Sequence, residues 1–109
     1  MLTMNRKLNE LAEQGKYIKV AIVGAGKMGK GLVNQMSRIR GMLPSLVVNR
    51  NIEKAVDAFF SAGIGQEDIV ISNSLNEINY YLEKGKFIAT EDMDLATKAN
   101  TIEAVVDAT

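Results

Sequence analysis

The stretch KVAIVGAGKMGKG, residues 19–31, joins an apolar run to a segment rich in glycine. The apolar run contains several β-branched residues, which favours a strand buried on both faces, as the strands of parallel sheets are. From Met28 to Ile39, apolar residues recur with a helical period of about 3.6, and Gly41 then predicts a left-handed helix end. The stretch therefore predicts a strand, a glycine turn and a helix in succession.

The glycines of this turn follow the pattern G-x-G-x-x-G. A lone match is weak, but this one follows a predicted strand and opens a predicted helix, which is the setting of a dinucleotide-binding turn. In such a turn the first glycine makes the bend, the second admits the pyrophosphate, and the third lets helix and strand pack closely. Free N–H groups and the helix dipole would then hold the anion. We expect six turn residues to bind the cofactor: Gly24, Ala25, Gly26, Lys27, Met28 and Gly29.

A P-loop is one alternative, because Gly24, Gly29 and Lys30 also fit G-x-x-x-x-G-K. A nucleoside-triphosphate site needs Ser or Thr at the next position to hold magnesium, and the chain has Gly31 there, which disfavours this alternative. A glycine turn without any ligand is a second alternative. The turn lysines could approach a phosphate, although exposed helix lysines are usually solvated.

The tip of the next predicted strand reads VVNRN, residues 47–51. NAD-specific domains carry an acidic side chain here, about 20 residues after the glycines, where it binds the adenosine ribose. This chain instead has Asn49, which does not repel a 2′-phosphate, and Arg50, whose planar guanidinium pairs well with phosphate. We therefore expect NADP as the cofactor, with both residues in its site, and NAD stays open. The alternative is that Arg50 is solvated and Asn49 binds a ribose without phosphate.

The rest of the chain alternates short apolar segments with helical patterns on short connections. Further strands are expected at SLVVN after Pro44, at DIVIS, at KFIAT and at IEAVVDAT; helices are expected after an Asn51 cap, after a Ser74–Glu77 capping box and over DLATKAN. This alternation predicts an α/β fold of the Rossmann type, doubly wound, with a mostly parallel sheet and helices on both faces.

Two parts of the chain are distinguished by their patterns. Residues 1–16 have apolar side chains at helical spacing and predict a leading amphipathic helix, and residues 17–109 predict the NAD(P)-binding Rossmann domain. The last predicted strand runs to the final residue, with no helix to cover the sheet beyond it. We therefore expect the N-terminal part of a longer protein, cut after the fourth or fifth strand.

The composition excludes several kinds of site. The 109 residues include 13 basic and 13 acidic side chains, no cysteine and no histidine. Disulfides, thiol nucleophiles and histidine-dependent triads are therefore excluded, and no metal site is expected. The balanced charge gives no reason to expect nucleic acid, and no apolar run is long enough for a membrane span or a secretory signal. We expect a cytoplasmic protein with no nucleic-acid or membrane partner.

Several segments carry a family resemblance: GKYIKVAIVGAGKMGKG, then VVNR, then the closing EAVVDAT. Together they resemble the N-terminal NAD(P)-binding domain of homoserine dehydrogenase-like oxidoreductases. The most similar branch has a C-terminal SAF domain and includes reductoisomerase-like enzymes that act on 1-deoxyxylulose 5-phosphate. The segment KFIATEDMDLAT and the leading residues are similar to that branch as well, so the resemblance covers nearly the whole chain.

The resemblance implies a function for the end of the last strand. In this family a loop beside the nicotinamide ring follows that strand, which implies that Asp107, Ala108 and Thr109 approach the cofactor, with Ala108 and Thr109 in its site. Catalytic residues are unknown and would lie beyond Thr109. The implied function is the cofactor domain of an NADP-preferring oxidoreductase that acts on CH–OH groups.

The partners follow from that function. They would be the nucleotide cofactor, a small-molecule substrate in the full-length protein and a possible second copy of the chain. An alternative is a dinucleotide-sensing regulatory module without turnover. We expect no turnover from this chain alone, because it lacks a second domain to hold a substrate against the cofactor.

Overall fold

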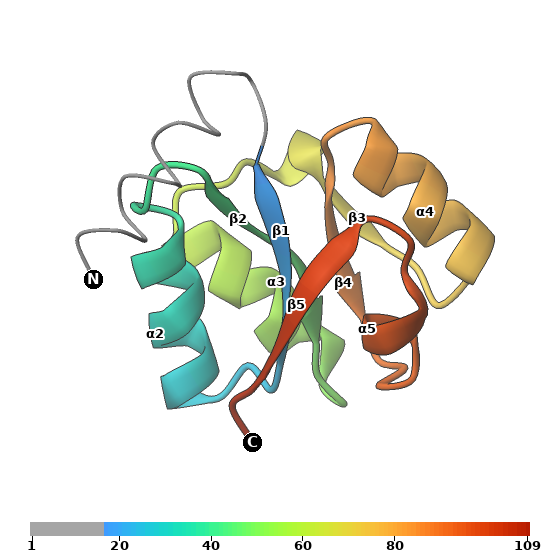
Figure 1. Cartoon of the computed structure of the whole chain (residues 1–109). Helices are drawn as coiled ribbons and strands as arrows, with labels where there is room; N and C mark the ends of the chain where they lie inside the picture. The colour runs from blue at the N-terminus through green and yellow to red at the C-terminus, as the bar shows by residue number, and fades with distance from the viewer. Residues whose placement is uncertain (1–16) are drawn as a thin grey trace.

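The computed structural model describes residues 17–109, so the leading helix expected over residues 1–16 lies outside the described residues. The described part forms a five-stranded, all-parallel sheet in the order β3-β4-β2-β1-β5 (Figure 1). The strands are β1 (Ile18–Val23), β2 (Met42–Val48), β3 (Ile69–Ile71), β4 (Phe87–Thr90) and β5 (Ile102–Asp107). This topology confirms the predicted Rossmann-type α/β fold.

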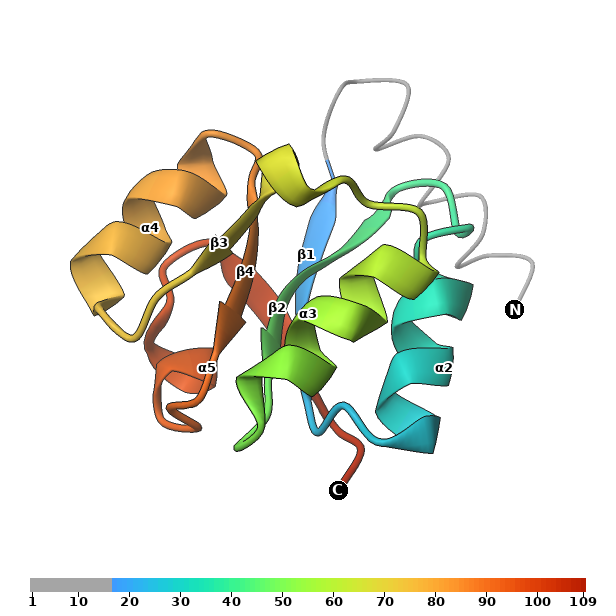
Figure 2. The ribbon, with the colours of Figure 1, turned by 180° about the vertical axis from the view of Figure 1, so that it is seen from behind.

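Helices cover both faces of the sheet. Helices α2 (Lys27–Met36) and α3 (Ile52–Ser61) lie on the face seen in Figure 2, and α4 (Leu75–Glu83) and α5 (Leu95–Lys98) lie on the other. The chain crosses the sheet in one direction from β1 through β2 to β3, and then returns through β4 to β5. Right-handed crossovers place the helices of these two halves on opposite faces.

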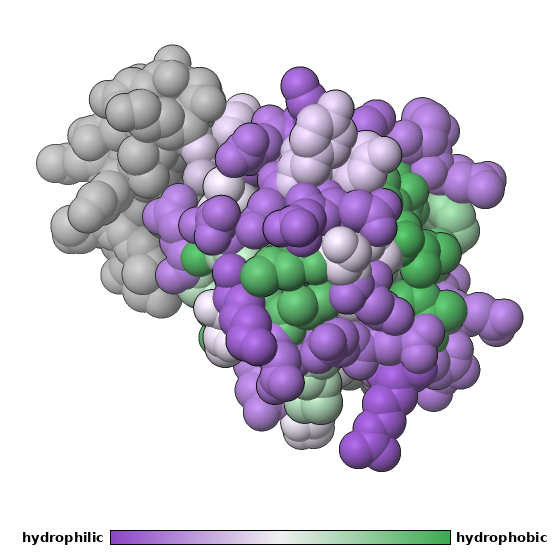
Figure 3. All heavy atoms as spheres, turned by 90° about the vertical axis from the view of Figure 1, so that its right-hand side faces the viewer, coloured by the Kyte–Doolittle hydropathy of each residue, from purple (hydrophilic) through white to green (hydrophobic). Residues whose placement is uncertain are grey.

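The core consists of two apolar layers, one on each face. Alternate residues of β1 point to opposite faces, so that Val20 and Ile22 pack with Phe59 of α3, whereas Ala21 and Val23 pack with Leu82 of α4. The central strands are buried on both sides, as the apolar run in the sequence predicts. On the side that carries α4 and α5, hydrophilic surface surrounds smaller apolar patches (Figure 3).

Helix α2 ends earlier than its apolar pattern predicts. The pattern extends to Ile39, but the helix stops at Met36 and Ile39 lies in the following turn. The reason is local, because the N–H groups of Arg38 and Ile39 donate to carbonyl oxygens three residues back instead of four, those of Gln35 and Met36 at 3.1 and 3.0 Å. The turn closes at Gly41, which has the predicted left-handed conformation with a φ of 89° but lies beyond the end of the helix that it was expected to cap.

Strand β2 differs from its prediction in a similar way. The prediction begins the strand after Pro44, whereas β2 begins at Met42 and includes the proline. Its pairing with β4 begins only at Leu46, so the missing N–H of Pro44 leaves no bond unmade on that side. On the other side, the register with β1 shifts between Val20 and Ala21, where Ser45 is bypassed.

The predicted capping box at the start of α4 forms only in part. Ser74 caps the helix as expected, because its hydroxyl accepts from the N–H of Glu77 at 3.4 Å. The Glu77 carboxylate does not return to the N–H of Ser74 and instead accepts from the hydroxyl of Ser72 at 3.3 Å. Ser72 in turn accepts from that N–H at 3.1 Å, so a third residue completes the cap.

Candidate functional site

Gly24 makes the bend that turns the chain from β1 into α2. Its φ is +102°, a conformation that strains any residue with a side chain. A Cβ atom here would also lie 3.1 Å from the carbonyl carbon of Ala108 and from Cγ2 of Thr109. The N–H of Gly24 donates to the carbonyl oxygen of Val48 at 2.7 Å, which ties the bend to the end of β2. The bend, the end of β2 and the end of β5 therefore lie together.

Gly29 lets α2 pack directly on this bend. A Cβ atom at Gly29 would lie only 1.8 Å from the carbonyl oxygen of Gly24. That atom belongs to the backbone, so no rotation of a side chain could relieve the clash. The close packing of helix and strand that the glycine pattern predicts is therefore present.

Gly26 has the opposite surroundings, although it lies only three residues before Gly29. It is exposed and occupies the N-cap position of α2, and a Cβ atom there would meet no protein atom within 4 Å. No side chain caps the helix, and its first turn contains no acidic residue. The first N–H groups of α2, which have no partners within the helix, therefore receive no side-chain cap either.

Asn49 fixes the position of the turn in a way that the sequence does not reveal. Its Oδ1 accepts from the N–H of Ala25 at 3.0 Å, and its Nδ2 donates to the backbone carbonyl of Asn51 at 2.9 Å. The N–H of Asn49 donates to the carbonyl oxygen of Thr90 at 3.0 Å. The side chain at the tip of β2 therefore holds the glycine turn and the start of α3 together, and Ala25 has no N–H left for a ligand.

A groove of about 390 Å³ opens at the carboxyl ends of these strands. Val23 and Val48 contribute apolar surface, and Gly24, Asn49, Arg50, Met93 and Thr109 complete the lining. The chain continues from β2 to a helix on one face of the sheet and from β4 to a helix on the other. Open α/β sheets bind ligands at the place where neighbouring strands diverge in this way. Four predicted residues thus line one groove.

Met93 was not among the predicted residues. It lies between β4 and α5, and it reaches the groove because β4 is the neighbour of β2 in the sheet. The order of the strands cannot be inferred from the sequence segment around Met93, so no local signal could have identified it.

The remaining predicted residues have different surroundings. Lys27 and Met28 are exposed in the first turn of α2, beside Gly26. Lys30, which could have approached a phosphate, instead pairs with Asp57 of α3 at 2.8 Å between Nζ and Oδ2. The Lys30 ammonium therefore has a partner on α3, in an exposed ion pair between the two helices.

The end of β5 completes the site beside the bend. The N–H of Ala108 donates to the carbonyl oxygen of Val23 at 2.8 Å, which extends the pairing of β5 with β1 past Asp107. Oδ1 of Asp107 accepts from the Thr109 hydroxyl at 2.6 Å and from the Thr109 N–H at 3.0 Å. These two bonds lower the pKa of Asp107 below its usual value, and the bond from the hydroxyl has the larger effect.

Acidic residues near the groove have roles within their own loop. Oδ1 of Asp92 accepts from the N–H of Asp94 at 3.0 Å, and the N–H of Asp92 donates to the hydroxyl of buried Thr90 at 3.2 Å. That hydroxyl donates to Oδ1 of Asn73 at 2.6 Å. Within residues 17–109, no group of three or more Asp and Glu side chains is arranged to hold a metal ion.

Among the described helices, none is long and apolar enough to cross a membrane.

Comparison of the sequence with known proteins identifies a family. No curated protein matches the sequence. The sequence does match the family described as shikimate / quinate 5-dehydrogenase over residues 5–108, in the part of that family that is an NAD(P)-binding domain of the oxidoreductase type. Because the match spans nearly the whole chain, this protein belongs to the shikimate / quinate 5-dehydrogenase family.

Proposed function

We propose that the chain is an NADP-preferring cofactor domain of an NAD(P)-dependent oxidoreductase. The observation that carries the proposal is the groove at the carboxyl end of the sheet. It contains a guanidinium group, that of Arg50, and no acidic side chain among the described residues that line it. A 2′-phosphate at the tip of β2 would meet a cation without a competing carboxylate.

The start of α2 supports the same orientation of the cofactor. Gly26 is exposed and no side chain caps the N–H groups of this turn, to which the exposed side chain of Lys27 adds a positive charge. A pyrophosphate there would complete hydrogen bonds that the helix itself cannot make. Arg50 would then take the adenosine end, and the end of β5 would lie beside the nicotinamide.

Asn49 contributes to this preference by replacing the acidic residue of NAD-specific domains. Its Oδ1 is already bound to the N–H of Ala25, so the carboxamide acts as a brace for the turn. In this proposal Asn49 shapes the site, and Arg50 contacts the phosphate. The predicted alternative, in which Asn49 binds a plain ribose, is less favourable because Oδ1 is occupied.

The resemblance to homoserine dehydrogenase-like oxidoreductases with a SAF domain stays a finer prediction. The family that matches is described by a different dehydrogenase activity, and both assignments share the cofactor domain. The same glycine turn and VVNR segment support either assignment.

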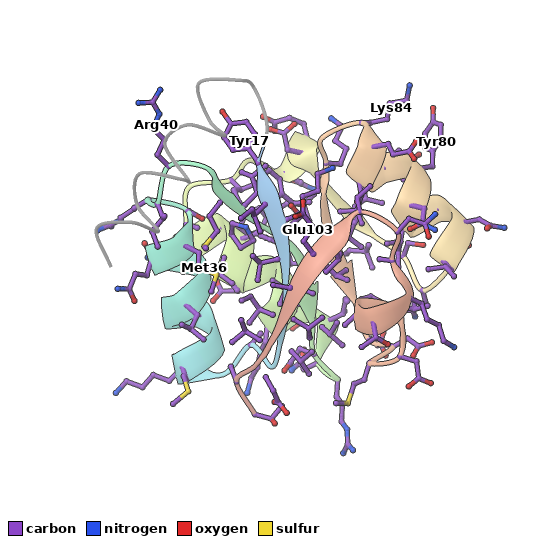
Figure 4. The ribbon with its side chains drawn as sticks, in the orientation of Figure 1. Tyr17, Met36, Arg40, Tyr80, Lys84 and Glu103 are labelled. Atoms are coloured by element: carbon purple, nitrogen blue, oxygen red, sulfur yellow. The ribbon has the colours of Figure 1, made fainter. Side chains whose placement is uncertain are left out.

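Titration calorimetry with NADPH and NADH tests the cofactor preference. We expect tighter binding of NADPH, and Arg50→Ala should weaken NADPH about 10- to 100-fold while changing NADH little, because only NADPH has the phosphate. Arg40→Ala is the matched control, since Arg40 is an exposed arginine at the opposite end of the molecule (Figure 4). Equal affinities in the unchanged chain, or a preference that survives Arg50→Ala, would refute the proposal.

A further inference from the structure

The hydrogen bonds at the end of β5 have a fixed direction. Oδ1 of Asp107 lies 2.6 Å from the Thr109 hydroxyl and 3.0 Å from the Thr109 N–H. An ionised carboxylate only accepts hydrogen bonds, so the hydroxyl hydrogen of Thr109 must point toward Asp107. The hydroxyl oxygen is then left with lone pairs alone, and it can only accept from any further partner.

The charge of Asp107 keeps that direction constant near neutral pH. The two bonds from Thr109 favour the ionised form and lower the pKa of the carboxyl group. Protonated Asp107, which could donate, would form only in acid. The end of β5 is therefore an acceptor-only surface made by one hydroxyl oxygen and one carboxylate.

The position of Thr109 determines which part of a cofactor could meet this surface. Thr109 lines the groove, and its Cγ2 lies against the Gly24 bend. Strand β5 flanks β1 on the side away from β2, so Thr109 and Arg50 lie on opposite sides of the bend. If Arg50 takes the adenosine phosphate, Thr109 meets the nicotinamide half.

We propose that Thr109, oriented by Asp107, accepts a hydrogen bond from the carboxamide amino group of the nicotinamide and so selects pyridine rings that have an N–H donor. The inference rests on the proposed function, because it assumes a bound NADP. The carboxamide amino group only donates, so an acceptor-only surface suits it. Ribose hydroxyls can donate to such a surface as well, and the two contacts are separated by cofactors that keep both riboses and change only the carboxamide. Asp107 is a positioning residue in this arrangement, and Thr109 makes the contact.

Cofactor analogues with an altered carboxamide test the inference on the whole chain. The 3-acetylpyridine analogue of NADP⁺ replaces the amino group with a methyl group, and the nicotinic acid analogue replaces it with a charged oxygen. Both keep the adenosine 2′-phosphate and the pyrophosphate. By calorimetry we expect the acetylpyridine analogue to bind about 3- to 10-fold more weakly than NADP⁺, from the loss of one hydrogen bond. The nicotinic acid analogue should bind more weakly still, because its charge lies near Asp107.

Matched variants separate this contact from a merely structural role. Thr109→Val removes the hydroxyl at nearly constant shape and should bring the ratio of acetylpyridine to NADP⁺ affinity close to 1, whereas Thr109→Ser should keep the ratio of the unchanged chain. Asp107→Asn removes the negative charge and should reduce the discrimination against the nicotinic acid analogue. If Thr109→Val abolished all binding, Asp107→Asn would decide. A smaller discrimination against the nicotinic acid analogue than in the unchanged chain would support the contact, and an unchanged discrimination would refute it.

The outcomes distinguish the two proposals. If NADP⁺ and both analogues bound the unchanged chain equally well, the Thr109 contact would be wrong while the proposed function stood. The same conclusion would follow if discrimination persisted in Thr109→Val and Asp107→Asn. If neither NADP⁺ nor any analogue bound, the proposed function would fail and the Thr109 contact with it.

Discussion

Two helices begin at the same edge of the sheet, α2 after β1 and α3 after β2, and their first turns differ. The start of α3 has a side-chain cap, because Oδ1 of Asn51 accepts from the N–H of Glu53 at 3.1 Å, and an acidic side chain lies in its first turn. The start of α2 has glycine at the N-cap position, no side-chain cap and no acid in its first turn. One terminus is closed by the chain, and the other is open to a ligand.

The difference shows how one edge of a sheet can separate stability from binding. A capped start contributes about 1 kcal/mol to the helix that it begins. An uncapped start forgoes that contribution, but its N–H groups remain available to an anion. The fold therefore does not require glycine at position 26, whereas it does require glycine at position 29.

Gly29→Ala should have the largest effect, because it disrupts the start of α2. The new Cβ would collide with the carbonyl oxygen of Gly24, and α2 would have to move away from β1. We expect a loss of at least about 3 kcal/mol in the free energy of unfolding, measured by urea denaturation. Gly31→Ala is the control, because its Cβ meets nothing within 4 Å, and it should raise stability by about 0.5–1 kcal/mol. Equal stability of the two variants would contradict the account.

Gly26→Asp should make the start of α2 resemble that of α3. The extended backbone at Gly26 suits an N-cap residue, so the carboxylate should raise stability by up to about 1 kcal/mol. NADPH affinity should fall about 100-fold, because the carboxylate takes the N–H groups and repels phosphate. Calorimetry and thermal unfolding measure the two effects. Gly26→Asn, which caps without charge, should give a smaller loss of affinity, and unchanged binding in both variants would show that the turn is not the phosphate site.

Asn51→Ala should make the reverse change at α3 and have the smallest effect. Removing the side-chain cap should cost about 1 kcal/mol of unfolding free energy. NADPH affinity should change by less than about twofold, because Asn49 bonds to the backbone carbonyl of Asn51 and keeps that bond. Asn76→Ala, at an exposed position within α4, serves as the stability control. A large loss of NADPH binding in Asn51→Ala would show that both termini belong to the site.

The predictable parts of this molecule are those that local spacing determines. The period of the apolar residues predicts the strands and helices, and the positions of Gly24 and Gly29 predict the bend and the close packing that the structure contains. The brace from Asn49 to Ala25 could not be predicted, because it depends on the pairing of β1 with β2. The position of Met93 in the groove likewise depends on β4 lying beside β2.

The two wrong predictions, for the end of α2 and the start of β2, have a common physical cause. The apolar pattern of α2 extends to Ile39, but the N–H groups of Arg38 and Ile39 bond three residues back, and the helix ends at Met36. Pro44 is tolerated inside β2 because the neighbouring strand starts pairing two residues later. In each case the local pattern of hydrogen bonds outweighs the average preference of a segment.

Amide chemical-shift mapping of the ¹⁵N-labelled chain with NADP⁺ reports each N–H group by itself, and so tests whether the start of α2 binds the cofactor. We expect shifts at residues 26–29 in the open start of α2, at Arg50 and at Thr109, with little change at Glu53 in the closed start of α3. Amides near Arg40 and Tyr80, at the far end of the molecule, should not move (Figure 4). Shifts confined to that far end, or none at saturating NADP⁺, would contradict the claim that the open helix start binds the cofactor.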